Sequence, residues 1–271
     1  MNLFLILAAG MVAASSPQDA PPASDAAGNR LLPLRVRESP PSDPDPDPTA
    51  CTADGRWCVS LPWASEVPEL RLIEKDSTGG ARSDPAFVPV ASPGDGEEGS
   101  VTIWPHILLE ADGAAIAGIV RARSAGYSGG GATTSRLELY RFPAAPAESS
   151  ALVLETDLHG SATIRACFDE ADMAKRAGAC SDEYELVGAL ALDPEVREGR
   201  PRFVLATHAR TFPGRRSRTV DSLAGPPLAS SDLVWADDPA CTFRRTFAFD
   251  ARSGRYAPDR PLPACENYFG F

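Results

Sequence analysis

Apolar and polar residues alternate along short segments through most of this chain. The stretch LELYRF at residues 137–142 is one example, and ATIRACF at 162–168 is another. A period of two places apolar side chains on one face of a strand and polar side chains on the other. One buried face and one wet face are typical of antiparallel sheets. Strand signals cover residues 56–61, 69–74, 86–91, 102–110, 115–123, 136–142, 152–157, 162–168, 184–192, 202–211 and 242–249.

Turn signals separate these segments. Asp112 and Gly113 lie between two apolar runs, a glycine-rich string fills residues 126–131, and another turn signal covers 250–254. Many short strands without an internal repeat predict an all-β fold, either an antiparallel β-sandwich or an open barrel. A propeller-like arrangement is the lesser alternative, because no repeat of blade length is visible.

One short helix is predicted, at residues 169–176. This segment, DEADMAKR, carries acids in its first turn and Lys175 and Arg176 in its last, and a glycine follows that is placed to end it. Because the segment lies between Cys167 and Cys180, we expect a surface helix that is clamped at its base by a disulfide.

The chain begins with an apolar stretch typical of an export signal. Residues 1–14, MNLFLILAAGMVAA, carry no charged side chain and end in small residues that suit a signal peptidase. We predict a cleaved signal peptide. A retained membrane anchor is the alternative, and Ser15, Ser16 and Pro17 disfavour it because they end the apolar run too early.

Three regions follow from this composition. Residues 15–50 are predicted to be a disordered Pro/Asp-rich linker, because prolines alternating with aspartates at 40–48 favour an extended chain. An apolar patch at 31–36 interrupts the linker and is expected to pair as an edge strand. Residues 51–271 are predicted to form the β domain, and a subdivision near 143–150 stays open.

The cysteines predict covalent staples. An even number in a chain that is expected to be exported favours disulfides over metal ligation, and no close C-x-x-C pair supports a zinc site. Among the connectivities that six cysteines allow, sequential pairing is favoured, and each closed loop should then contribute about 2 to 4 kcal/mol. The predicted pairs are Cys51 with Cys58, Cys167 with Cys180, and Cys241 with Cys265.

The net charge of the chain limits the classes of partner that it is expected to bind. There are 26 Lys and Arg residues against 37 Asp and Glu residues, so the formal net charge is −11. Nucleic-acid phosphates are neutralised by clustered excess Lys and Arg, so no nucleic-acid partner is expected. No transmembrane segment is expected after signal cleavage. The hydrophobic content of 43% is sufficient for a buried core.

Catalytic motifs are weak. The string GYSGG around Ser128 matches G-x-S-x-G, but a nucleophile elbow needs a strand before it and a helix after it. We therefore predict a hairpin tip there. Asp157, His159 and Ser161 would share one face of a regular strand, yet Gly160 favours a turn in the sequence DLHGS.

No catalytic residue, metal ligand or cofactor-binding residue is assigned, and no cofactor is expected. His106, His159 and His208 stand far apart in the sequence, which favours strand or loop positions over metal ligation.

An arginine cluster is the one candidate binding site. Arg210, Arg215, Arg216 and Arg218 surround a Pro-Gly turn in the segment TFPGRRSRT. Guanidinium groups bind planar oxyanions through two parallel hydrogen bonds, so this tip is a speculative anion-binding site. A solvated hairpin end is the alternative interpretation.

These observations lead to a general functional hypothesis. We expect an exported β domain that binds a ligand or an envelope partner in the periplasm or at the cell surface. Two alternatives remain: a secreted hydrolase with catalytic residues on its loops, in which His159 or His208 would meet a carboxylate, and a structural component of the cell envelope.

Overall fold

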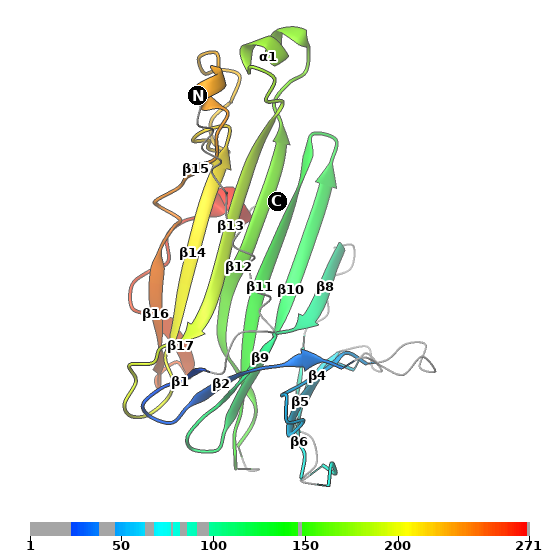
Figure 1. Cartoon of the computed structure of the whole chain (residues 1–271), viewed down its shortest axis with the longest axis vertical. Coiled ribbons are helices and arrows are strands. Elements are labelled where there is room, and N and C mark those ends of the chain that lie inside the picture. The colour runs from blue at the N-terminus through cyan, green and yellow to red at the C-terminus, as the bar shows by residue number, and fades with distance from the viewer. Residues whose placement is uncertain are drawn as a thin grey trace, which may run out of the picture.

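The chain folds as an all-β structure with two antiparallel sheets, one of twelve strands and one of five. The computed structural model describes residues 23–37, 47–62, 68–76, 78–81, 86–90, 98–145 and 148–269. The long strands of the large sheet stand side by side, and the small sheet lies near one end of them (Figure 1). The predicted all-β, disulfide-stapled fold is confirmed. The signal peptide predicted at 1–14 lies outside the described residues.

The large sheet runs in the order β1-β2-β9-β10-β11-β12-β13-β14-β16-β17, with β8 beside β10 and β15 beside β14. Its strands are β1 (Ala23–Ser24), β2 (Arg30–Pro33), β8 (Glu98–Ile103), β9 (His106–Leu109), β10 (Ala115–Tyr127), β11 (Gly130–Phe142), β12 (Ala151–Arg165), β13 (Ser181–Leu192), β14 (Phe203–Phe212), β15 (Ala236–Asp237), β16 (Arg244–Asp250) and β17 (Arg255–Pro258). Most neighbours along the chain are also neighbours in the sheet, so short connections suffice.

The small sheet covers one end of the large one. Its strands are β3 (Arg35–Val36), β4 (Thr49–Cys51), β5 (Trp57–Ser60), β6 (Glu69–Glu74) and β7 (Ala86–Pro89), in that order. Val59 and Leu70 from this sheet pack in one buried cluster with Tyr140 and Phe142 of β11. This arrangement fits the predicted sandwich.

Strict alternation in β11 divides the core between two faces. Tyr140 and Phe142 face the small sheet, whereas Leu137 and Leu139 belong to a second buried cluster with Phe203 and other residues of β14, β16 and β17. Arg136 and Glu138 lie nearer the end of β11 that the small sheet leaves uncovered, and both line a hollow there. At the covered end, Arg141 is paired with the buried Glu110.

The β10–β11 hairpin explains the glycine-rich string. Tyr127 pairs with Gly130, so Ser128 and Gly129 form the tip, as predicted. Gly130 has a φ of 151°, and a Cβ atom there would lie 1.8 Å from the carbonyl oxygen of Thr163 on the next strand. Glycine is needed at this position because neighbouring backbone occupies the space of a side chain.

The region expected to be a linker contains strands. In its described part, β2 pairs with β9 in the large sheet and β3 pairs with β4 in the small one. The pairing expected for the apolar patch at 31–36 is thus present, and Leu31 and Leu34 are buried because they pack in the two cores. The Pro/Asp-rich residues 38–46 lie outside the described residues.

The segment near residues 143–150 connects two adjacent strands of one sheet. β11 and β12, on either side of it, pair from Gly130 with Ile164 to Arg141 with Ala151.

Helix α1 (Glu170–Lys175) confirms the predicted helix. The Asp169 carboxylate accepts a hydrogen bond from the backbone N–H of Asp172 and caps the first turn, as acidic N-caps do. A second short helix, α2 (Glu266–Phe269), was not predicted. It lies in the last described residues, where the tertiary structure rather than a periodic pattern places it against the sheet.

All three predicted disulfides are present. Cys51–Cys58 joins β4 to β5, Cys167–Cys180 closes the base of α1, and Cys241–Cys265 ties the C-terminal segment to the loop before β16. No cysteine of the described ranges is free.

Candidate functional site

The site begins where β12 and β13 separate. Their ladder extends from His159 with Val187 to Arg165 with Ser181, so residues 151–158 of β12 have no strand on that side within the described structure. A bulge in β12 coincides with this separation: Ser135 of β11 pairs with His159, but Arg136 pairs with Asp157. The extra residue, Leu158, locally bends the strand and opens the sheet.

This strand corrects the turn that the sequence predicted in DLHGS. β12 continues through these residues to Arg165. Gly160 is buried in the strand because the C-terminal segment crosses over it: a Cβ atom there would lie 2.5 Å from the carbonyl oxygen of Tyr268. The glycine marks a close approach of two backbones, which is the other common reason for glycine inside a strand.

The C-terminal segment is held firmly over the large sheet. Cys265 is bonded to Cys241, and the fully buried Tyr268 donates its hydroxyl hydrogen to Asp238 Oδ2 at 2.9 Å. Tyr268 also packs edge-on against Tyr184 of β13. The segment therefore forms a fixed wall.

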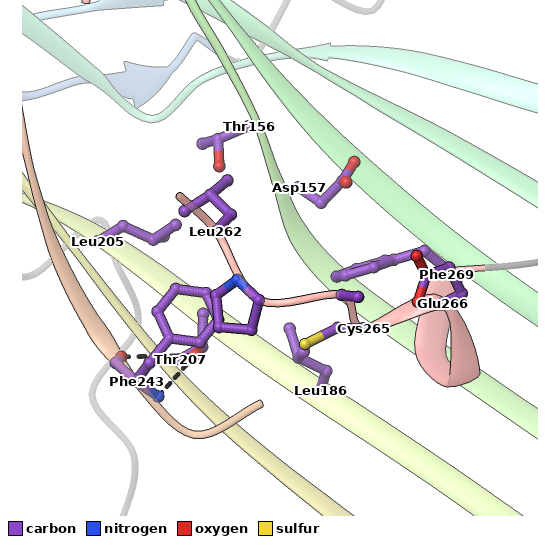
Figure 2. Close-up of a pocket in the computed structure, with 12 residues that line it drawn as sticks. Thr156, Asp157, Leu186, Leu205, Thr207, Phe243, Leu262, Cys265, Glu266 and Phe269 are labelled. Atoms are coloured by element: carbon purple, nitrogen blue, oxygen red, sulfur yellow. Dashed lines mark hydrogen bonds between the residues drawn. The ribbon is translucent and has the colours of Figure 1, made fainter. Parts of the chain in front are cut away.

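A cavity of about 340 Å³ lies between this wall and the parted strands; we call it the central cavity. Figure 2 shows its lining, which comes from β12, β13, β14, the loop before β16 and the C-terminal segment. The lining residues are Thr156, Asp157, Leu186, Leu205, Thr207, Phe243, Leu262, Pro263, Ala264, Cys265, Glu266 and Phe269. Most of these side chains are apolar.

Thr156 is one of four polar residues that line the central cavity, with Asp157, Thr207 and Glu266. Thr156 is only 5% exposed, and its hydroxyl has no hydrogen-bond partner among the described residues. In Figure 2 this hydroxyl points toward Leu262 and the interior. Thr207, by contrast, is satisfied, because its hydroxyl donates to the carbonyl oxygen of Cys241 and accepts from the backbone N–H of Phe243.

A second hollow of about 300 Å³ adjoins the central cavity and shares Asp157 and Phe269 with it. It lies on the uncovered face of β10, β11 and β12; we call it the charged hollow. Its lining residues are Arg121, Arg123, Thr134, Arg136, Glu138, Glu155, Asp157 and Phe269.

Three ion pairs link side chains that line the charged hollow. Arg121 Nε donates to Glu138 Oε1 at 2.9 Å, while Arg136 donates from Nε to Asp157 Oδ1 and from Nη1 to Glu155 Oε1, each at 2.8 Å. Burial disfavours the charge of Glu138, but hydrogen bonds from Arg121 and Tyr140 outweigh that cost and hold the pKa of Glu138 below its usual value. The Glu138 carboxylate is thus ionised, and ion pairs hold the side chains of Glu138, Glu155 and Asp157 in position.

A third hollow, of about 370 Å³, lies at the free edge of β12 and shares Thr156, Asp157 and Leu262 with the central cavity. It is also lined by Tyr256, a residue 6% exposed whose hydroxyl has no partner in the described structure. Burial raises the pKa of Tyr256, so its hydroxyl stays protonated.

The four predicted anion-binding arginines do not line one common hollow. Arg210 forms an ion pair with Glu185 and lies over the Trp235 ring at 4.5 Å, and Arg216 Nε lies 3.6 Å from the buried carboxylate of Asp182. The other two are Arg215, which is exposed, and Arg218, which lines a separate hollow near α1. Anion binding at this cluster stays a prediction.

The Asp157, His159 and Ser161 string is not assembled as a catalytic group. Adjacent residues of β11 pair with Asp157 and His159, so the bulge turns these two side chains to opposite faces. Ser161 instead shares a hydrogen bond with the Thr133 hydroxyl at 2.7 Å. The three side chains would share one face only in a regular strand, and the bulge at Leu158 interrupts that regularity.

The other histidines are also apart. His208 Nε2 lies 3.1 Å from Asp237 Oδ1, but both side chains are largely exposed on the surface. His106 is half-buried, and burial lowers its pKa. In the described part of the chain, no three His, Cys, Asp or Glu residues come together as metal ligands.

In the comparisons with known proteins, no family model, no curated protein and no solved structure matches this chain. Within the residues that the structure describes, no helix has the length and apolar character to cross a membrane.

Proposed function

We propose that this protein is an exported binding protein that holds a small, mainly apolar molecule in the central cavity. The observation that carries the proposal is the Thr156 hydroxyl, which is buried in an apolar lining and has no partner among the described residues. The cavity volume of about 340 Å³ falls within the usual range for small-molecule sites, roughly 300 to 1,000 Å³.

The unpartnered hydroxyl supports a ligand because it is costly to bury. A buried polar group without a hydrogen bond loses about 1 to 3 kcal/mol of desolvation free energy. A bound molecule with one polar atom near Thr156 would recover that loss, while its apolar part would contact Leu186, Leu205 and Phe243. A mainly apolar lining with a few polar groups is the usual composition of such sites.

The lining favours binding over hydrolysis. It contains no histidine, and its one cysteine is in a disulfide. Of its two carboxylates, Asp157 is engaged by Arg136 and Glu266 is exposed to solvent. A base next to a nucleophile, the arrangement that nucleophilic catalysis needs, is not found among these residues.

Export is part of the proposal. Three disulfides form readily outside the reducing cytosol, and residues 1–14 have the composition of a signal peptide. These two features together support a periplasmic or secreted location.

The test is a fluorescence titration of the oxidised protein with N-phenyl-1-naphthylamine, an uncharged apolar dye. We expect saturable binding with blue-shifted emission. A Leu262→Trp variant, which places a bulky ring in the cavity lining, should weaken dye binding by about tenfold. Val220→Trp, at another exposed apolar position, is the matched control and should bind normally. Absence of saturable binding, or equal binding by both variants, would contradict the proposal.

A further inference from the structure

Two arginines stand side by side in the charged hollow. Arg121 of β10 and Arg136 of β11 are direct partners in the ladder, and both face the side that the small sheet leaves uncovered. Like charges directly opposite each other are unfavourable unless counter-charges are present. Here Glu138, Glu155 and Asp157 supply those counter-charges.

Only two of the three guanidinium nitrogens of Arg121 contact the Glu138 carboxylate. Nε and Nη2 contact the two oxygens of Glu138 at 2.9 and 3.4 Å, but Nη1 has no partner among the described residues. The residue is 9% exposed, so this donor is more than nine-tenths buried. Arginine cannot accept a hydrogen bond, so only an acceptor can satisfy it.

The carboxylates of the charged hollow already form ion pairs with its arginines. Arg136 contacts Asp157 through Nε and Glu155 through Nη1, which leaves Nη2 outside both ion pairs. A ligand cation would have to compete with these arginines for the carboxylates. A ligand oxyanion would instead meet guanidinium N–H groups that the ion pairs leave over, and charge-assisted bonds of this kind are the stronger class.

The geometry points to an amphiphile with an oxyanion head as the ligand. We propose that its apolar body occupies the central cavity and that its head, a carboxylate or sulfate, accepts hydrogen bonds from Arg121 and Arg136. The two chambers are adjacent, because Asp157 and Phe269 line both. This inference rests on the proposed function, because it assigns the head group of the molecule bound there.

The experiment compares ligands with the same ten-carbon chain and different heads. Decanoate, decyl sulfate, decan-1-ol and decyltrimethylammonium, each below its micelle concentration, are used to displace N-phenyl-1-naphthylamine. We expect the two anions to displace the dye at concentrations about tenfold lower than the alcohol, with the cation weakest.

Arg121→Lys tests the assignment of the head. Lysine keeps the charge beside Glu138 but lacks the second donor arm, so decanoate should lose most of its advantage while decan-1-ol is unaffected. Arg210→Lys, at an ion pair with Glu185 outside the hollow, is the matched control and should behave as the wild type. Arg136→Lys, read out in the same way, replaces Arg121→Lys if that variant does not fold.

The outcomes separate the two proposals. If the dye binds but all four heads compete equally, or the alcohol or cation competes best, the head-group assignment is wrong and the cavity remains a binding site. If decanoate keeps its advantage in the arginine variants, the head lies elsewhere. If the dye does not bind at all, the proposed function itself fails.

Discussion

Single residues define this site through what they leave unsatisfied. Thr156, Tyr256 and Arg121 each bury a polar atom without a partner in the described structure, and all three line hollows that meet at Asp157. Native proteins satisfy the great majority of such atoms, so each exception calls for an explanation. Three of the eight such side-chain atoms in the described structure lie at these adjoining hollows.

The Thr156 hydroxyl should destabilise the ligand-free protein. Thr156→Val keeps the shape of the side chain and removes the unpaired group, so we expect the free energy of unfolding to rise by about 1 kcal/mol. Urea denaturation without ligand measures this change in the free energy of unfolding. Thr163→Val, an exposed position on the same strand, should change the free energy of unfolding little. A destabilised Thr156→Val variant would mean that the hydroxyl is paired in solution.

Gly160 should be required by the crossing of the C-terminal segment. In Gly160→Ala the new Cβ atom would collide with the Tyr268 carbonyl oxygen and the Phe269 ring, and we expect a loss of about 1 to 3 kcal/mol together with weaker dye binding. Gly126→Ala is the matched control, because nothing lies within 4 Å of a Cβ atom there. Equal thermal stability of the two variants would show that the segment does not cross at Gly160.

At the scale of elements, the bulged strand β12 leaves part of its edge unpaired and contributes residues to both the central cavity and the charged hollow. Its ladder with β13 stops at His159, and Thr156 and Asp157, which precede that point, line hollows with the C-terminal segment and with β17. Its paired side supports the ion-pair network that extends over β10 and β11. One strand therefore shapes both the apolar and the charged chamber.

That three-strand network should make the protein sensitive to acid. The pKa of Glu138 in the folded state lies below the ordinary value of 4.5, because the hydrogen bonds from Arg121 and Tyr140 outweigh burial. The ionised group thus adds stability above about pH 4.5, and that stability is lost as the pH falls through the folded-state pKa.

Glu138→Gln measures this contribution. The variant should be less stable than the wild type at pH 7, and the difference in the free energy of unfolding should shrink toward pH 3. Glu185→Gln, at a more exposed ion pair, should show a smaller difference at pH 7. A Glu138→Gln difference that grew with acid would contradict the assigned pKa direction.

At the scale of the whole molecule, two of the disulfides stabilise different parts of the structure. Cys51–Cys58 lies within the small sheet, whereas Cys241–Cys265 fastens the wall of the central cavity. Stability and binding should therefore respond differently to the loss of each.

Paired Cys→Ser variants test this division. Both the 51/58 and the 241/265 variants should lose about 2 to 4 kcal/mol of stability. Dye affinity should fall by at least about tenfold in the 241/265 variant and stay near the wild-type value in the 51/58 variant. Equal affinities in two folded variants would remove the C-terminal segment from the binding site.

The sequence by itself determined the local features of this protein. Alternating polarity specified strands, the acids and bases of residues 169–176 specified α1, and close spacing specified three disulfides, because each of these depends on neighbours along the chain. Gly160 shows the limit: the same glycine suits a turn or a crossing of two backbones, and only the tertiary structure places Tyr268 above it.

The proposed binding site depends on the tertiary structure. Thr156 and Arg121 are ordinary strand residues in the sequence, and they become distinctive only when burial removes water and folding supplies no partner. The bulge at Leu158 likewise depends on how β11 and β13 pair with β12. Periodicity reports which face a side chain takes, but whether its polar atoms are satisfied depends on residues far away in the chain.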